Sequence, residues 1–181
     1  LLCPLDDGSV LMVHLRMSGQ LLVTPPGALR PPHTHVVAEL SAVDDRPPAE
    51  LWFVDPRTFG EVVVYDPTDV AVQVPELARL GIDPIAEPFT RRDLRRILRS
   101  RSRRLKPLLL DQAYVAGIGN IYADEILHAA RVRPDRRSDQ LSLAAEARLH
   151  TAILTVLGAA IEAGGSTLRD AQYVDLTGES G

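Results

Sequence analysis

The feature that most constrains this chain is a change in the spacing of its apolar residues near Asp66. Before Asp66, short segments rich in Val and Leu alternate with Gly, Pro and Asp clusters, which predicts strands. The expected strands are residues 10–15, 20–24, 34–40, 51–55 and 61–65. After it the apolar residues recur at helical spacing. The expected helices are residues 75–81, a helix starting at Thr90, and residues 107–112, 120–130 and 142–163. Strands followed by helices predict the α+β class, with a partial antiparallel β-sandwich preceding a helical domain.

The 181-residue length allows one large domain or two small ones. The stretch LGIDPIAEP has the composition of a linker, so we expect domains at residues 1–85 and 86–181. Thr90 and Asp93 have capping-box spacing at the first helix of the second domain. With one cysteine, Cys3, the chain by itself forms no disulfide and no four-cysteine zinc site. We expect no membrane-spanning segment and no signal segment, and we expect further residues before Leu1, which replaces the usual Met.

Positive charge is concentrated in one short block. Residues 1–90 carry a net charge of −8, residues 91–106 carry nine bases against one acid, and residues 107–181 carry −4. Such a block is typical of a phosphate-binding stripe, but also of a solvated helix face. Nineteen of the twenty bases are Arg, and Lys106 is the only Lys.

The most specific segment is residues 108–127, LLLDQAYVAGIGNIYADEIL. Gly117 and Gly119 interrupt a helical pattern and permit positive φ and close backbone approach. Asn120 occupies the expected N-cap of the next helix. Open amides at a helix N-terminus bind anions such as a DNA phosphate, whereas a tight helix–helix connection with an ordinary cap explains the same residues.

This segment resembles the helix–two-turn–helix motif of the formamidopyrimidine-DNA glycosylase and endonuclease VIII family. Three further blocks agree in the family's order: HLRMSG at residues 14–19, DPRTFG at residues 55–60 and GGSTL at residues 164–168. HLRMSG with DPRTFG is similar to the formamidopyrimidine branch. The resemblance implies that residues 86–181 are a helix–two-turn–helix DNA-binding domain that ends in the base-binding loop.

Members of this family flip a damaged purine out of duplex DNA and fill the resulting gap. The resemblance assigns that role to Met17, Arg57 and Phe59. Met is flexible, Phe can wedge between bases, and Arg can bond the unpaired base. Arg57 and Phe59 alternate with Thr58, so in extended chain they share a face. Without the family, Met17 and Phe59 would be core residues and Arg57 a surface charge.

The resemblance implies three further DNA-binding residues, His14, Asn120 and Lys106, which are expected to contact phosphates of the DNA backbone. A core histidine and a solvated lysine are the alternatives for His14 and Lys106. The lesion loop is expected to include Ser166, Thr167 and Arg169.

This sequence departs from the family at the catalytic groups. The family uses an N-terminal Pro that forms a Schiff base, a following Glu and a Lys on an early hairpin, and none of these is found here. The family also has a four-cysteine zinc finger, so one zinc ion is implied for the intact parent and no cofactor for this chain. No catalytic or metal-binding residue is therefore assigned.

The resemblance implies base-excision repair. We expect a fragment of a bifunctional glycosylase/AP lyase that removes 8-oxoguanine and formamidopyrimidines from double-stranded DNA, with the chain itself inactive. A non-catalytic, naturally truncated DNA-binding paralogue is the alternative. RNA binding is a third possibility, which the HLRMSG and DPRTFG blocks disfavour. We also expect a monomer that acts in the bacterial cytoplasm at the nucleoid, without a membrane partner.

Overall fold

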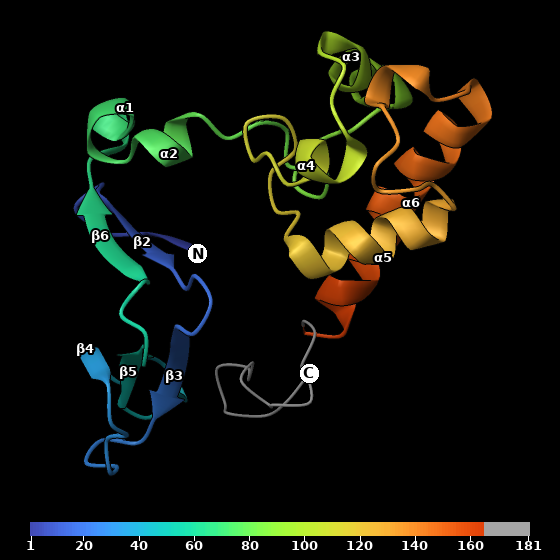
Figure 1. The fold of residues 1–181 in the computed structure, drawn as a ribbon. Coiled ribbons are helices and arrows are strands. Elements are labelled where there is room, and N and C mark those ends of the chain that lie inside the picture. Colours follow the sequence, from blue (N-terminus) through green and yellow to red (C-terminus); the bar gives the residue numbers. More distant parts are fainter. Residues whose placement is uncertain (165–181) are drawn as a thin grey trace. The chain divides into compact units, whose positions relative to one another are not determined.

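The computed structural model describes residues 1–164 and divides the chain into two compact units (Figure 1). One unit contains Leu1–Gln73 and is called the β unit below. The other, Val74–Glu162, is called the helical unit. Their composition confirms the α+β class expected from the sequence.

The β unit consists of two separate three-stranded antiparallel sheets. The first has the order β1-β2-β6 and the second β3-β5-β4. The strands are β1 (Leu2–Pro4), β2 (Val10–His14), β3 (Gln20–Thr24), β4 (Thr34–Leu40), β5 (Ala49–Val54) and β6 (Glu61–Tyr65). A short 3-10 helix η1 (Pro67–Asp69) and α1 (Val70–Gln73) follow. The sequence predicted neither of these two short helices, and among the strands it missed only β1, which pairs with β2 and is too short for a visible alternation.

Two loops connect the first sheet to the second, and both leave from the same end of each sheet. Strands β2 and β6 pair as far as His14 and Glu61, and strands β3 and β5 begin pairing at Gln20 and Val54. The first crossover loop is therefore residues 15–19 and the second crossover loop is residues 55–60. Because the flanking strands are paired, the two loops are held side by side.

Each crossover loop ends in a glycine that packs against Phe53 of β5. A Cβ atom on Gly60 would lie 2.5 Å from Phe53 Cζ and 3.0 Å from the carbonyl oxygen of His14. A Cβ atom on Gly19 would overlap the carbonyl oxygen of Leu15 and lie 3.0 Å from Phe53 Cε2. No side chain fits at either position without displacing its neighbours, which explains why both motifs end in glycine.

The helical unit contains five α-helices and a 3-10 helix between residues 74 and 162. They are α2 (Pro75–Ala78), α3 (Arg91–Ser100), α4 (Leu105–Leu109), α5 (Asn120–Ala130), η2 (Ser138–Gln140) and α6 (Leu143–Glu162). The capping box predicted for α3 is confirmed: Thr90 accepts from the Asp93 amide at 3.2 Å, and Asp93 accepts from the Thr90 amide at 3.0 Å. Just beyond α6, Gly164 has a φ of +73°, as expected for a glycine stop.

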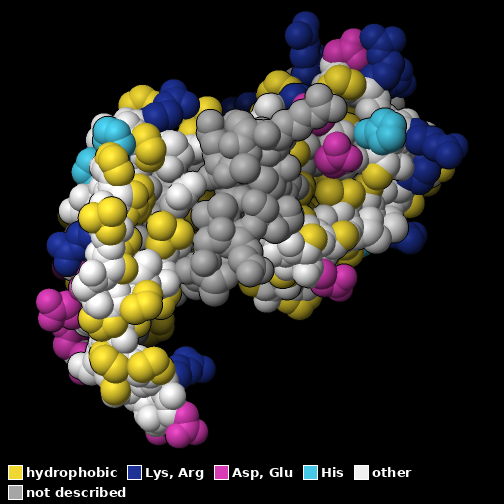
Figure 2. All heavy atoms as spheres, turned by 90° about the horizontal axis from the view of Figure 1, so that it is seen from below, with side chains coloured by type: hydrophobic (Ala, Val, Ile, Leu, Met, Phe, Trp, Pro, Cys, Tyr) yellow, Lys and Arg dark blue, Asp and Glu magenta, His cyan; other side chains and the backbone are white. Residues whose placement is uncertain are grey.

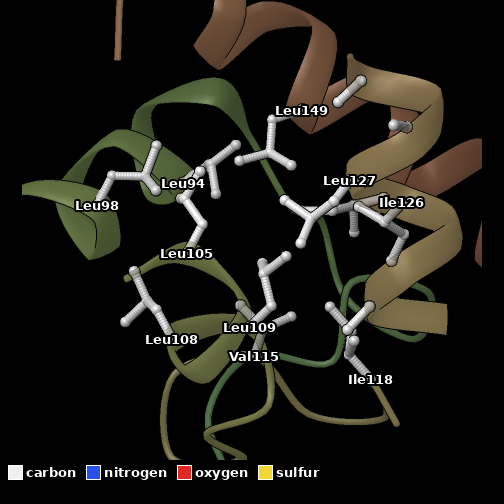
Figure 3. Close-up of a cluster of buried hydrophobic side chains, with 14 of the residues drawn as sticks. Leu94, Leu98, Leu105, Leu108, Leu109, Val115, Ile118, Ile126, Leu127 and Leu149 are labelled. Atoms are coloured by element: carbon white, nitrogen blue, oxygen red, sulfur yellow. The ribbon is translucent and has the colours of Figure 1, made fainter. Parts of the chain in front are cut away.

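One apolar core joins α3, α4, α5 and α6 of this unit. Leu94 and Leu98 of α3 contribute the stripe expected from their spacing, and both are almost fully buried. Figure 3 shows these leucines with side chains from α4, α5 and α6 in one cluster. The other labelled members are Leu105, Leu108, Leu109, Val115, Ile118, Ile126, Leu127 and Leu149. The glycine-rich turn between α4 and α5 is fixed to this core, because its residues Val115 and Ile118 are buried there.

The helical unit begins at Val74, earlier than the boundary expected near residue 85. The reason is backbone hydrogen bonding that the sequence does not reveal. Gly81 donates to Gln112 at 2.8 Å, and Ala116 donates to Ile82 at 2.9 Å. The segment predicted as a linker is therefore bonded to the double turn.

Helix α6 has the length and mean hydropathy, 1.2, of a membrane-spanning helix, which the sequence analysis did not expect. Its apolar residues have another explanation within this unit. Leu149 and Ile153 are fully buried in the core, and Glu146 near its start is buried and ion-paired. These contacts are those of a core helix.

Candidate nucleic-acid interface

Met17, Arg57 and Phe59 lie together on the two crossover loops. The Arg57 Nη1 group donates to Met17 Sδ at 3.6 Å, and the guanidinium carbon lies 5.0 Å from the centre of the Phe59 ring. Met17 is 59% exposed and Phe59 is 55% exposed. Two large apolar side chains exposed together around an arginine are unusual in a chain that could bury them. The structure thus brings together the three residues to which the family resemblance assigns one role, whereas that role toward DNA stays a prediction.

The backbone beneath these side chains is in the left-handed region at two residues that are not glycine. Arg16, immediately before Met17, has a φ of +52°, and Thr58 has a φ of +56°. Such conformations cost about 1 kcal/mol or more and persist where the surroundings enforce them. Arg57 and Phe59 therefore come to the same side through a turn at Thr58, and not through the extended chain expected from the sequence.

A buried carboxylate, Asp55, joins the two crossover loops. Its side chain accepts from the Ser18 hydroxyl at 2.5 Å, from the Gly60 amide at 2.7 Å and from the Arg57 amide at 3.2 Å. No part of Asp55 is exposed. The Ser18 hydroxyl, followed by the Gly60 amide, lowers the pKa of Asp55 to about 2, so it is ionised at neutral pH. The sequence analysis missed this residue.

His14 ends β2 beside the first crossover loop and is exposed. Its Nδ1 atom accepts from the Arg16 amide at 3.1 Å, so the neutral ring carries its proton on Nε2. Partial burial, followed by the charge of Arg16, lowers the pKa of His14 below 6.5. The ring therefore presents a neutral Nε2–H donor at pH 7, a group that can bond a phosphate oxygen. The alternative of a core histidine is wrong, because the side chain lies at the surface.

The double turn between α4 and α5 is organised by Gln112. Its Nε2 group donates to the carbonyls of Ile118 at 2.9 Å and Leu110 at 3.1 Å, and its Oε1 atom accepts from the Gly117 amide at 2.9 Å. Gly117 has a φ of +84°, the conformation expected for a glycine. Gln112 was not singled out from the sequence, although it belongs to the same motif.

Asn120 is not the N-cap of α5, as the sequence predicted, but its first helical residue. The N-cap is Gly119, which has extended backbone and no side chain to accept from the helix amides. No acidic residue lies in the first turn of α5 either. Among the described residues, the positive dipole end of α5 therefore has no side-chain cap, and the exposed Asn120 lies beside it.

Lys106 forms an ion pair with another helix, and its expected role toward a phosphate stays a prediction. Its Nζ atom lies 2.8 Å from Asp124 Oδ2, and this ion pair links α4 to α5. The lysine side chain is 27% exposed. A DNA phosphate would have to share this ammonium group with Asp124.

Much of the basic block serves the fold. Arg95 and Arg99 of α3 both bind Glu146 of α6, at 2.7 and 2.8 Å. Burial raises the pKa of Glu146, but the two arginines outweigh that effect and lower it below its usual value. The solvated helix face that the charge block also suggested is therefore wrong for these two arginines, because their long side chains reach α6.

The other arginines of residues 91–106 differ in whether they form an ion pair. Arg103 pairs with Asp111 at 2.7 Å, and Arg96 pairs with Asp93 at 3.0 Å. Within residues 1–164 no ion pair is formed by Arg91, Arg92, Arg101 or Arg104. These four are the members left available for a phosphate. Figure 2 shows dark-blue side chains gathered over the helical unit.

Ser166, Thr167 and Arg169 lie outside the residues that the structure describes. Among the described residues no group of three or more His, Cys, Asp or Glu side chains is placed to hold a metal ion, and Cys3 is exposed. This part of the chain does not fit the zinc ion implied for the intact parent, so no step is assigned to it.

Two family models match the chain. The formamidopyrimidine-DNA glycosylase N-terminal domain matches residues 1–62, and the formamidopyrimidine-DNA glycosylase H2TH domain matches residues 80–172. The β unit and the helical unit each match a domain of the same class of protein, a DNA glycosylase. The chain belongs to the formamidopyrimidine-DNA glycosylase family.

Individual relatives agree. A formamidopyrimidine-DNA glycosylase of Pelotomaculum thermopropionicum is 43% identical over all of this chain and 63% of its own length. The crystal structure of the MutM (Fpg) protein of Thermus thermophilus has a TM-score of 0.84 and 39% identity, over 99% of this chain and 63% of that one. A Lactococcus lactis FPG mutant bound to Fapy-dG DNA has a TM-score of 0.84 and 31% identity, with the same coverage. The chain therefore spans less than two thirds of the length of these relatives.

Proposed function

We propose that the protein to which this chain belongs removes oxidised purines, namely 8-oxoguanine and formamidopyrimidines, from double-stranded DNA and then cleaves the abasic strand. The observation that carries this proposal is the exposed cluster of Met17, Arg57 and Phe59 on the crossover loops. It is supported by the relative solved with Fapy-dG DNA, a damaged-purine substrate.

Flipping a base out of a duplex leaves a gap, and this cluster has the groups to fill it. Phe59 is an exposed wedge of the kind that unstacks base steps. Arg57 lies against both Met17 and Phe59, so its guanidinium is at the same exposed place as the wedge. A guanidinium there can bond the base left without a partner.

Phosphate contacts would come from both units. In the β unit, His14 offers its Nε2–H group beside the first crossover loop. In the helical unit, the uncapped start of α5 offers backbone amides and the Asn120 amide. These contacts position DNA but do not read its sequence.

The test of the wedge is Arg57→Ala in the full-length protein. It should reduce discrimination between bases opposite the lesion by about 1–3 kcal/mol, because one good base contact is lost. Arg46→Ala is the matched control: Arg46 bonds Val43 near the far ends of β4 and β5 and makes no ion pair among the described residues. Equal discrimination in both variants would refute the assignment.

We propose further that this 181-residue chain has no glycosylase or lyase activity by itself. Its only lysine, Lys106, is paired with Asp124 and is therefore not a free amine. Borohydride trapping on an 8-oxoguanine duplex should give no covalent adduct with this chain and an adduct with the full-length protein. An adduct with the chain would refute this part, and no adduct with either would favour the non-catalytic paralogue.

DNA binding by the chain should be weak, nearly independent of sequence and strongly dependent on salt. The reason is that Arg91, Arg92, Arg101 and Arg104 offer charge without a base code. A titration of affinity against salt should give a steep slope. A flat response would rule out the electrostatic account.

Three further expectations belong to this proposal. The protein should sediment as a monomer, carry one zinc ion per full-length chain by metal analysis, and act in the bacterial cytoplasm at the nucleoid. Dimeric sedimentation or a zinc-free full-length protein would contradict the first two, and fractionation away from DNA would contradict the third.

A further inference from the structure

We propose that Asp55 is the positioning residue for opposite-base recognition, acting through Arg57 without touching DNA itself. This inference rests on the proposed function of the Met17, Arg57 and Phe59 cluster. Its basis is that one buried carboxylate is bonded to both crossover loops, and those loops carry every member of the cluster.

The contacts of Asp55 divide between the two loops. Oδ1 accepts from the Ser18 hydroxyl, next to Met17 in the first crossover loop. The same oxygen accepts from the Arg57 amide, and Oδ2 accepts from the Gly60 amide, next to Phe59 in the second crossover loop. The side chain thus bonds the Arg57 amide, the Gly60 amide next to Phe59 and the Ser18 hydroxyl next to Met17.

The main chain of Asp55 makes further hydrogen bonds, to β4 and to the residue just before it. Its amide donates to the carbonyl of His33 at 3.0 Å, and its carbonyl bonds His35 Nε2 at 2.9 Å. Asp55 also accepts from the Thr58 amide through its carbonyl at 3.2 Å, at the left-handed turn. The main chain of Asp55 is therefore hydrogen-bonded to His33 and His35, while its side chain is hydrogen-bonded to the two crossover loops.

This arrangement requires a carboxylate and not merely a polar side chain. Both oxygens accept, and two of the three donors are backbone amides, which cannot turn round to become acceptors. In Asp55→Asn one oxygen becomes an NH₂ group, so the amide of either Gly60 or Arg57 faces another donor. The volume is unchanged, so the variant perturbs hydrogen bonding with little effect on packing.

The experiment measures the affinity of the full-length protein for duplexes that contain a tetrahydrofuran abasic analogue opposite each of the four bases. The readout is the ratio of the strongest to the weakest affinity. Asp55→Asn should reduce this ratio about tenfold, the size expected for one charge-assisted hydrogen bond. Ser18→Ala, which frees only the first crossover loop, should reduce it less.

A double-mutant cycle separates positioning from general stability. If Asp55 acts through Arg57, then Asp55→Asn should change the ratio by less than about twofold when Arg57→Ala is already present. Asp66→Asn is the matched control, because Asp66 accepts from the Thr68 amide at 2.8 Å in a similar turn after the other end of β6. It should leave the ratio unchanged.

Two results would overturn the inference. One is an unchanged ratio in Asp55→Asn while Arg57→Ala lowers it, and the other is an equal loss of affinity for all four duplexes, which indicates a structural role only. If Asp55→Asn does not fold, an unchanged ratio in Ser18→Ala overturns the inference instead. If the wild-type protein shows no discrimination at all, the proposed role of Arg57 fails first, and this inference fails with it.

Discussion

The β unit and the helical unit reach rigidity by different physical means. Within the described residues, nineteen buried apolar side chains of the helical unit form one cluster, whereas only six are buried in the β unit. Those six are Met12, Val13, Trp52, Phe53, Val54 and Tyr65. Of the described residues, the β unit holds two buried carboxylates that accept several hydrogen bonds each, and the helical unit holds one, Glu146.

Asp55 and Glu50 are the buried carboxylates of the β unit. Glu50 accepts from Trp52 Nε1 at 2.7 Å and from Arg30 at 3.1 Å, and Asp55 holds the crossover loops. Hydrogen bonds are directional, so they define loop geometry where apolar contacts are too few to do so. In the β unit, hydrogen bonds to a carboxylate position the crossover loops that carry Met17, Arg57 and Phe59. In the helical unit, a packed core supports the backbone amides at the start of α5.

The largest effect should come from the helical core. Leu149→Ala removes a fully buried side chain, and we expect a loss of about 2–5 kcal/mol of unfolding free energy. Leu143→Ala, at a 65% exposed position of the same helix, should change it by less than about 0.5 kcal/mol. Urea denaturation gives both values, and hydrogen exchange should localise the loss to the helical unit. Similar values for both variants would contradict a single dominant core.

The next effect concerns the glycine closure of the second crossover loop. Gly60→Ala places a methyl group against Phe53 and the His14 carbonyl, and overpacking of this kind costs about 1–3 kcal/mol. Gly158→Ala in α6, where nothing lies within 4 Å, should instead stabilise by about 0.5–1 kcal/mol. Thermal unfolding checks both signs. If Gly60→Ala is neutral, the loop is looser than these contacts indicate.

Acid should act on the β unit through Asp55. Its pKa is about 2 in the folded chain and near 3.8 without these contacts, so the folded state favours the ionised form. The stabilisation is complete above about pH 4 and is lost as the pH falls toward 2, because the unfolded chain takes up the proton first. Stability of the β unit, followed by Trp52 fluorescence, should therefore decrease over this range. Asp55→Asn should be less stable at pH 7 and should lose this contribution to the pH dependence.

The smallest effect should be at the start of α5. Gly119→Ser supplies the missing cap, and because nothing lies within 4 Å it should stabilise the helical unit by a few tenths of a kcal/mol. The hydroxyl would then occupy a helix amide that a phosphate could bond, so DNA affinity should fall while stability rises. Opposite signs of the two changes, by thermal unfolding and DNA titration, support the proposed amide site. A parallel rise would contradict it.

The sequence by itself determined the class and the order of most of the elements. Local rules account for this success: apolar spacing separated strands from helices, and Thr90 with Asp93 marked the start of α3. The association of Met17 with Arg57 and Phe59 came from the family resemblance, since nothing local joins residues so far apart in the chain. The structure shows that they meet on loops held side by side by paired strands.

Only the tertiary structure decided how charged and polar groups are used. Glu146 pairs with arginines of α3, Lys106 pairs with Asp124, and Asp55 is buried between two loops. No local pattern distinguishes these residues from solvated ones, because their partners lie on other elements. The N-cap of α5 is Gly119 and not Asn120, and the turn before it is bonded by Gln112. Whether a charge binds a ligand or supports the fold depends on long-range contacts, which only the folded chain creates.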